Sequence, residues 1–130
     1  MQAQEIKIKN KNSNYSILIG NNILNLLSKK IDSICPKTQK VALIFDKRVP
    51  ANYKKKLLNN LKKYELISLS FNSSEKAKSF NSVKFFLNKL LLKNFNRTDL
   101  IIGVGGGITG DLVGFVASIF KRGINFISVP

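Results

Sequence analysis

The hydrophobic positions of this chain change their spacing along its length. Apolar and polar residues alternate over 6–9, a polar turn occupies 10–14, and the alternation resumes over 15–19. Alternation on both sides of a polar turn is typical of two strands that pair with each other. The chain is therefore predicted to begin with a β-hairpin or a pair of adjacent strands.

From residue 23 onward, segments with helical spacing alternate with short, continuous apolar runs. The helical segments, whose apolar residues recur every three or four positions, are 23–34, 50–61, 79–91 and about 108–120. Pro50 is expected in the first turn of its helix, Ser79 is expected to cap the next, and Gly123 is expected to stop the last. The apolar stripes expected to face the core are Ile23, Leu26, Leu27, Ile31 and Ile34, then Leu57, Leu58 and Leu61, then Phe80, Val83, Phe86, Leu87, Leu90 and Leu91. Buried strands are predicted at 41–45, 100–104 and 124–129, and a further strand is predicted at 66–71.

Strands that alternate with helices predict a parallel sheet joined by right-handed crossovers. The predicted fold class is α/β: a Rossmann-like, mostly parallel sheet with flanking helices, preceded by an N-terminal β-hairpin. No linker, repeat or low-complexity segment divides residues 1–130, so they are expected to form one domain. The last predicted strand ends at Pro130, where such a strand normally leads into a functional loop. We therefore expect the domain to be truncated at its C-terminal end.

The net charge of +15 brings a nucleic-acid partner into consideration. However, only Arg48, Arg97 and Arg122 among the 22 basic residues are arginines, the residue type on which base and phosphate recognition depends most. The lysines are scattered, which is typical of a solvated surface. We expect no nucleic-acid partner. A lysine-rich nucleic-acid-binding module is the less favoured alternative and would show steeply salt-dependent binding.

Other compositional features restrict the chemistry and the location. The chain has no histidine and a single cysteine, Cys35, which excludes Ser-His triads, histidine-containing zinc sites and a disulfide framework from these residues. The N-terminus has neither the basic nor the apolar region of a signal peptide. The most apolar stretch, 100–120, contains Asp111 and six glycines, so it is not expected to span a membrane. A cytoplasmic protein without a membrane partner is expected.

The strongest chemical signal is a glycine-rich turn between the predicted strand at 100–104 and the helix that follows. Gly105, Gly107 and Gly110 satisfy the pattern G-x-G-x-x-G. Glycines allow backbone N–H groups to approach a pyrophosphate closely, and the helix N-terminus adds partial positive charge. Glycine-rich turns also serve tight packing, but the strand-turn-helix context and the three consecutive glycines favour phosphate or dinucleotide binding.

Acidic residues near this turn admit two interpretations each. No acidic residue follows the motif at the ~20-residue spacing of a ribose-binding carboxylate. Asp46 instead ends a buried strand at the edge where open α/β sheets bind ligands, so it either accepts from ribose hydroxyls or caps its own turn. Asp111, expected in the first helical turn, either interacts with the helix dipole or contacts ligand hydroxyls. Glu75 and Lys78 form either a solvated ion pair or part of the site.

The segment from Gly105 to Phe115, followed by Arg122-Gly123-Ile124 and the run from Phe126 to Pro130, resembles the 3-dehydroquinate synthase family of the shikimate pathway. The resemblance extends in order over the whole chain. The superfamily also includes 2-deoxy-scyllo-inosose synthases and, more distantly, iron-type and glycerol alcohol dehydrogenases, which remain alternatives. Two positions depart from the family pattern: Ser74 stands where Gly is frequent, and Arg48 stands where Asn is frequent.

The resemblance implies conversion of 3-deoxy-D-arabino-heptulosonate 7-phosphate to 3-dehydroquinate and phosphate, with catalytic NAD and a divalent metal, zinc or cobalt. It also implies that the metal ligands and the catalytic residues lie outside this chain, in a C-terminal helical domain that the chain lacks. Residues 1–130 would then be the NAD-binding part and inactive alone. The full-length protein is expected to be a homodimer.

The resemblance also assigns roles to individual residues. Arg122 is similar to an arginine that reaches the substrate phosphate in the neighbouring subunit's site. The residues implied to bind NAD are Asp46, Ser73, Ser74, Glu75, Lys76, Ala77, Lys78, Gly105, Gly106, Gly107, Ile108, Thr109, Gly110 and Asp111.

Overall fold

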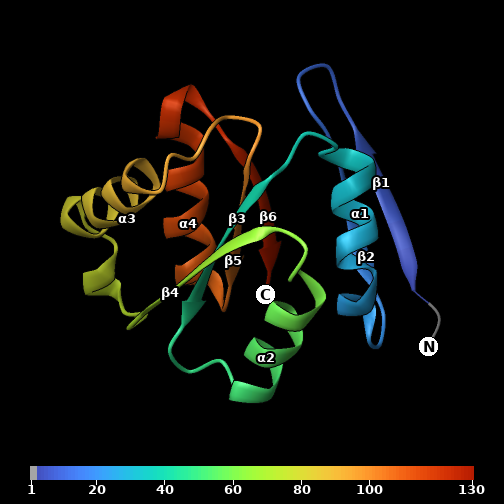
Figure 1. The fold of residues 1–130 in the computed structure, drawn as a ribbon, viewed down its shortest axis with the longest axis horizontal. Coiled ribbons are helices and arrows are strands. Elements are labelled where there is room, and N and C mark those ends of the chain that lie inside the picture. The colour runs from blue at the N-terminus through green and yellow to red at the C-terminus, as the bar shows by residue number, and fades with distance from the viewer. Residues whose placement is uncertain (1–2) are drawn as a thin grey trace.

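The computed structural model describes residues 3–130 of the chain. Two sheets are present in this part: the antiparallel hairpin β1-β2 and a parallel sheet of order β4-β3-β5-β6 (Figure 1). The strands are β1 Gln4–Lys9, β2 Asn14–Ile19, β3 Lys40–Asp46, β4 Glu65–Phe71, β5 Leu100–Val104 and β6 Asn125–Val129. The helices are α1 Leu27–Ile34, α2 Ala51–Asn60, α3 Phe80–Leu92 and α4 Gly107–Ile119, with short 3-10 turns η1 Ile23–Leu26, η2 Glu75–Ala77 and η3 Phe120–Arg122. The predicted α/β class with an N-terminal hairpin is confirmed.

The two central strands of the parallel sheet, β3 and β5, are buried on both faces, as their continuous apolar runs predict, whereas the edge strands β4 and β6 are partly exposed. Alternate residues of β3 point to opposite sides: Val41, Leu43 and Phe45 pack with α1 and α2, whereas Ala42 and Ile44 pack with α3 and α4. Figure 1 shows the resulting layers, with α3 and α4 on one side of the sheet and α1 and α2 on the other. The sheet and the two helical layers together hold the ends of the strands in fixed positions.

The strand order creates a crevice position at the carboxyl edge of the sheet. From β3 the chain proceeds outward to β4, then crosses back to β5 on the other side of β3, and continues to β6. The direction of winding therefore reverses between β3 and β5. In open α/β sheets, ligands bind at such a reversal, outside the carboxyl ends of the strands. Asp46, the last residue of β3, and the glycine turn that follows β5 lie at this reversal.

Several residues of the predicted apolar stripes do not face the core. Leu26 is 39% exposed, Ile34 57%, Phe80 86% and Leu91 52%. Helical spacing predicts which face of a helix is apolar, but not how far the neighbouring surface extends. These side chains near the helix ends therefore stay largely exposed, while the central residues of α3, Val83, Phe86 and Leu90, are buried as predicted.

Helix boundaries differ from the predictions by small amounts. Pro50 is the N-cap residue of α2 rather than part of its first turn, since its ψ of 144° is not helical. Ser79 caps α3 as predicted, because its Oγ accepts from the backbone N–H of Ser82 at 3.3 Å. Gly123 follows η3 with a φ of 122°, which suits glycine, and so ends the helical segment as predicted. None of the helices in the described part of the chain is both long and apolar enough to cross a membrane.

A pH-dependent contribution to stability is expected from the ion-paired surface of α1. The Tyr64 hydroxyl donates to Asp32 Oδ1 at 2.6 Å, and burial, followed by the bond to Asp32, raises the pKa of Tyr64 from 10.0 to about 12. Between these values the folded chain keeps a proton that the unfolded chain releases. The tyrosine therefore stabilises the fold fully below about pH 10, and this contribution falls as the pH rises through that interval.

Replacement by phenylalanine isolates this effect. The difference in unfolding free energy between wild type and Tyr64→Phe, measured by urea denaturation, is expected to shrink from about pH 9 to about pH 11.5. A difference that stays constant over this range would show that the hydroxyl does not hold its proton more tightly in the fold.

Candidate nucleotide-binding site

The glycine turn begins with a residue that the chain's own packing requires to be glycine. Gly105 has a φ of 151°, and its N–H donates to the carbonyl oxygen of Val129 at 3.0 Å. A Cβ placed there would lie 2.6 Å from Thr109 Oγ1 and 3.0 Å from the Cβ of Asp46. Both the backbone conformation and the space therefore exclude a side chain. The same contact brings the end of β3 against the turn that follows β5.

The next two glycines are not explained by the packing of the chain. A Cβ placed on Gly106 or Gly107 would meet no atom within 4 Å, and both residues are exposed. Gly106 is the N-cap of α4, with an ordinary φ of −79°. Open space above two glycines at the start of a helix is what the close approach of a ligand to the backbone requires.

The N-terminus of α4 offers hydrogen-bond donors to such a ligand. Within residues 3–130 no side chain caps the first turn of α4, so its leading amides have no intrahelical or side-chain acceptor. Thr109 Oγ1 is the buried side-chain polar atom without a partner in the same described range, and it lies directly beside Gly105. The free amides and the positive end of the helix dipole together fit a phosphate or pyrophosphate group, whereas the Thr109 hydroxyl is fully buried behind them.

Asp46 is held at this edge by the residue two positions later. Its side chain is 6% exposed, and its carboxylate accepts from the Arg48 backbone N–H at 3.0 Å and from Arg48 Nη2 at 3.0 Å. Burial acts to raise the pKa of Asp46, but the hydrogen bonds and charge of Arg48, with a smaller contribution from the Ser73 hydroxyl, lower it overall. Asp46 is thus a charged carboxylate that caps its own turn and lies beside the glycine turn.

The loop after β4 is tied to both of its neighbours. The Ser73 carbonyl accepts from Arg48 Nη2 at 3.4 Å, while Lys78 Nζ lies 3.0 Å from Asp111 Oδ2 and 4.0 Å from Glu75 Oε2. The hydrogen bond to Asp111, then the charge of Glu75, raise the pKa of Lys78. Lys78 therefore joins this loop to α4. The predicted alternative, in which Glu75 and Lys78 form a solvated ion pair on their own, does not include this bond to Asp111.

Asp111 lies one residue further into its helix than predicted, just past the first turn. Because α4 begins at Gly107 rather than near Ile108, Asp111 falls in the second turn and no acidic residue occupies the first. The predicted place of Asp111 in the first turn is therefore wrong. Its side chain forms an ion pair with Lys78.

The remaining predicted residues gather around the same edge. Ser74 is the N-cap of η2 and its carbonyl accepts from the Ala77 N–H at 2.9 Å, while Lys76 is exposed. Ile108 and Gly110 are half-buried in the first turn of α4. The predicted nucleotide-contacting segments thus come from three loops, after β3, β4 and β5, which meet at the carboxyl edge of the sheet.

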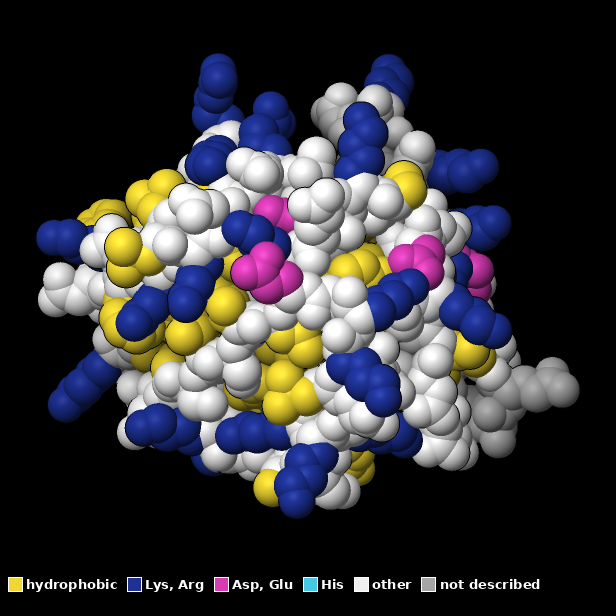
Figure 2. Space-filling model, in the orientation of Figure 1, with side chains coloured by type: hydrophobic (Ala, Val, Ile, Leu, Met, Phe, Trp, Pro, Cys, Tyr) yellow, Lys and Arg dark blue, Asp and Glu magenta, His cyan; other side chains and the backbone are white. Residues whose placement is uncertain are grey.

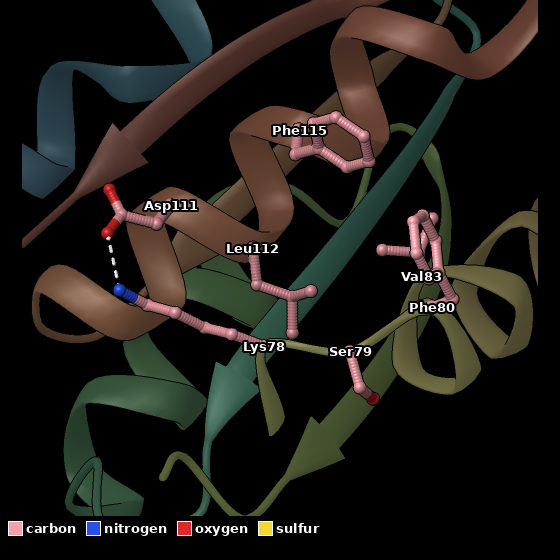
Figure 3. A pocket seen from close by; sticks show the side chains of 7 residues that line it. All are labelled: Lys78, Ser79, Phe80, Val83, Asp111, Leu112 and Phe115. Atoms are coloured by element: carbon pink, nitrogen blue, oxygen red, sulfur yellow. Dashed lines mark ion pairs between the residues drawn. The ribbon is translucent and has the colours of Figure 1, made fainter. Parts of the chain in front are cut away.

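A pocket that the sequence did not reveal adjoins this edge between α3 and α4 (Figure 3). It has a volume of about 280 Å³ and mostly apolar walls, with the Lys78–Asp111 ion pair at one end. The lining residues are Lys78, Ser79, Phe80, Val83, Asp111, Leu112 and Phe115. Phe80 was predicted to face the core from its helical spacing, and that spacing did not indicate that its side chain lines a pocket. Figure 2 shows hydrophobic side chains gathered over α3 and α4.

Arg122 is not brought to this edge. Helix α4 starts at the glycine turn and runs ~20 Å toward the amino ends of the strands, and η3 with Arg122 follows its far end. Arg122 has a φ of 66° and is exposed. Within the chain it therefore stands apart from the glycine turn.

A metal centre is likewise not assembled by these residues. Over residues 3–130 no three Asp, Glu or Cys side chains lie close enough together to hold a metal ion.

On the face in Figure 2, lysines and arginines are spread out rather than gathered in one patch, as predicted for a solvated surface.

Comparison with known proteins agrees with this geometry. The family model for the N-terminal part of 3-dehydroquinate synthase matches residues 68–130. The 3-dehydroquinate synthase of Pelagibacter ubique is 42% identical over 126 residues, which are 97% of this chain and 34% of the relative. That of Clostridium botulinum is 38% identical over 131 residues, covering 98% of this chain and 37% of the relative. The chain spans about a third of the length of these relatives.

A solved structure also shares the fold. The crystal structure of 2-deoxy-scyllo-inosose synthase complexed with carbaglucose-6-phosphate, NAD⁺ and Co²⁺ superimposes with a TM-score of 0.84 at 24% identity, over 98% of this chain and 35% of that one. The parallel sheet, the hairpin and the glycine turn thus define an α/β domain of the dehydroquinate synthase-like fold. Within that fold, the chain belongs to the 3-dehydroquinate synthase family and corresponds to the N-terminal part of its relatives.

Proposed function

We propose that the chain is the NAD-binding part of a 3-dehydroquinate synthase, which converts 3-deoxy-D-arabino-heptulosonate 7-phosphate to 3-dehydroquinate and phosphate. The observation that carries the proposal is the open space above Gly106 and Gly107 at the uncapped start of α4. Family membership and the presence of NAD⁺ in a protein of the same fold support it.

In this proposal the chain's own residues bind and orient. The first amides of α4 donate to the pyrophosphate, and the helix dipole stabilises its charge. The loop after β4 closes over the same edge and is fixed by the Lys78–Asp111 ion pair. NAD, when bound, supplies the hydride acceptor and donor for the reaction.

The remaining chemistry is assigned to groups outside these residues. Since residues 3–130 contain no set of metal ligands, the divalent metal, zinc or cobalt, would be bound elsewhere in the full-length protein. Arg122, at the far end of α4, would serve the substrate site of a neighbouring subunit in a homodimer. We expect a cytoplasmic enzyme, with residues 1–130 inactive on their own.

The test combines binding and turnover. Calorimetric titration of the full-length protein with NAD⁺ is expected to show saturable binding, and addition of the heptulosonate phosphate is expected to release inorganic phosphate only when NAD⁺ and metal are present. Residues 1–130 alone are expected to release none. Tight RNA binding at physiological salt without NAD⁺ binding would contradict the proposal and favour a nucleic-acid-binding module.

A related sugar-phosphate cyclase is the second candidate, because the match to 2-deoxy-scyllo-inosose synthase extends over nearly the whole chain. The two are separated by the substrate. Phosphate release from a hexose 6-phosphate, with none from the heptulosonate phosphate, would select the second candidate.

A further inference from the structure

The position of Asp46 in the strand order identifies the place where the sugar next to the adenine would lie. In dinucleotide-binding sheets, the pyrophosphate lies at the glycine turn, and an acidic group nearby hydrogen-bonds the ribose 2′-hydroxyl. Here the carboxylate beside the glycine turn is that of Asp46, the last residue of β3, which pairs with β5. The contact between Gly105 and Asp46 confirms that the two are neighbours. This step rests on the proposed function.

The carboxylate at that place is already occupied by a guanidinium group. Arg48 Nε lies 3.2 Å from Asp46 Oδ2 and 3.4 Å from Oδ1, and Arg48 Nη2 lies 3.0 Å from Oδ2. With the backbone N–H of Arg48, both carboxylate oxygens accept hydrogen bonds from the same residue. Little capacity remains for the two hydroxyls of a ribose.

The guanidinium itself is the accessible group at this edge. The Arg48 side chain is 71% exposed while that of Asp46 is 6% exposed. Because Arg48 Nη2 also reaches the Ser73 carbonyl at 3.4 Å, the guanidinium is held across the loops after β3 and β4. In the part of the chain that the structure describes, Nη1 of Arg48 has no hydrogen-bond partner, so its N–H groups are available to a ligand. Lys47, beside it in sequence, is also exposed.

The local charge at this edge therefore favours binding of an anion. An unpaired acidic residue, as NAD-binding sheets ordinarily have near the ribose, would repel one. The charge of Asp46 is balanced by Arg48, and the other acidic groups near this edge, Glu75 and Asp111, both pair with Lys78. Arginine binds phosphate through parallel N–H···O bonds and stacks on aromatic rings such as adenine. In dinucleotide-binding domains an arginine near the ribose accommodates a 2′-phosphate.

We propose that Arg48 makes this site accept a phosphate on the adenosine ribose 2′-hydroxyl, so that the protein binds NADP⁺ as well as NAD⁺. Arg48 is thus a specificity-determining residue for the dinucleotide. The ion pair with Asp46 removes the acidic barrier to the phosphate and fixes the guanidinium that would bind it.

The experiment measures both dinucleotides against the full-length protein. Calorimetric Kd values are obtained for NAD⁺, NADP⁺, 2′,5′-ADP and 5′-AMP with wild type and with Arg48→Gln. Lys29→Gln, at an exposed position of α1, removes one positive charge away from the site and serves as the matched control. Arg48→Lys keeps a cation beside Asp46 and is used if Arg48→Gln fails to fold.

Wild type and Lys29→Gln are expected to bind NADP⁺ within about tenfold of NAD⁺ and to bind 2′,5′-ADP more tightly than 5′-AMP. Arg48→Gln is expected to weaken NADP⁺ and 2′,5′-ADP at least about tenfold, the usual range for a charged hydrogen bond. Because Asp46 is then free to accept from the ribose, NAD⁺ is expected to bind more tightly. The NADP⁺ affinity of Arg48→Lys is expected to lie between those of wild type and Arg48→Gln, since lysine keeps the charge but not the paired hydrogen-bond geometry.

Two results would overturn the inference, and they differ in what they leave standing. If NAD⁺ binds but NADP⁺ is at least about a hundredfold weaker in every variant, Arg48 does not accept the 2′-phosphate while the proposed function holds. If neither dinucleotide binds, the proposed function fails together with the inference.

Discussion

Gly106→Val is expected to leave the fold intact and to abolish dinucleotide binding. A side chain at this position meets no atom of the chain within 4 Å, and the φ of −79° suits any residue. The unfolding free energy is therefore expected to change by no more than about 1 kcal/mol, the usual effect of replacing an N-cap glycine by a branched residue. The same side chain would fill the space that a pyrophosphate needs. Calorimetry is expected to show NAD⁺ binding weakened at least about a hundredfold.

Two further substitutions make this result interpretable. Gly105→Ala, in contrast, should destabilise the fold, because a φ of 151° and a distance of 2.6 Å to Thr109 Oγ1 penalise any Cβ. Its cost is expected to be at least about 2 kcal/mol of unfolding free energy, from backbone strain and overpacking together. Ser118→Ala, at an exposed position near the other end of α4, controls for a change in the helix and should alter neither quantity by much.

The contrast between adjacent glycines decides what the turn is for. If Gly106→Val binds NAD⁺ as well as wild type, the turn is a packing feature and the proposed function loses its main support. If Gly106→Val loses as much unfolding free energy as Gly105→Ala, a side chain at Gly106 is not accommodated by the folded chain.

The arrangement of the site was predictable where it follows from strand order. The continuous apolar run of β3 predicts a strand buried on both faces, and Asp46 at its end was placed at the carboxyl edge for that reason. The strand-turn-helix pattern likewise predicted where Gly105 to Gly107 would lie. Parallel strands bring their carboxyl ends to one edge, so these segments had to meet.

What the sequence did not predict are the contacts made by individual side chains across that edge. Nothing in the spacing indicates that Arg48 pairs with Asp46, or that Lys78 reaches Asp111 more closely than Glu75. The unpaired hydroxyl of Thr109 is also invisible in one dimension, because it depends on what surrounds a buried atom. Periodicity fixes the face of an element, whereas these features depend on distances between elements.

Asp99→Ala is expected to be among the most destabilising substitutions of a polar residue in this chain. Asp99 is 2% exposed and lies immediately before β5. Its carboxylate accepts from the backbone N–H groups of Lys40 at 2.9 Å, Asn96 at 2.8 Å and Gln39 at 3.2 Å. Alanine would leave three donors near the start of the sheet without this acceptor. The three hydrogen bonds are part-buried, and a hydrogen bond to a charged group contributes about 1.5–3 kcal/mol, so a loss of at least about 3 kcal/mol of unfolding free energy is expected from urea denaturation.

The controls for this prediction are chemically matched. Asp99→Asn keeps one side-chain oxygen and should lose less than alanine does. Asp32→Ala removes an aspartate whose side chain is 54% exposed and whose partners are the exposed Lys63 and the partly buried Tyr64, and should cost about 1 kcal/mol or less. Equal losses for Asp32→Ala and Asp99→Ala would show that the three amides find water or other acceptors when the carboxylate is gone.

The location of Asp99 adds a second expectation that separates stability from binding. Asp99 joins the amino ends of β3 and β5, at the edge of the sheet opposite the glycine turn. Where the Asp99→Ala protein is still folded, its Kd for NAD⁺ should therefore stay within about threefold of wild type, since distant sites without shared partners act independently. A much weaker Kd in the folded variant would mean that the two edges of the sheet are coupled, and that the carboxyl edge depends on how the amino ends of β3 and β5 are held together.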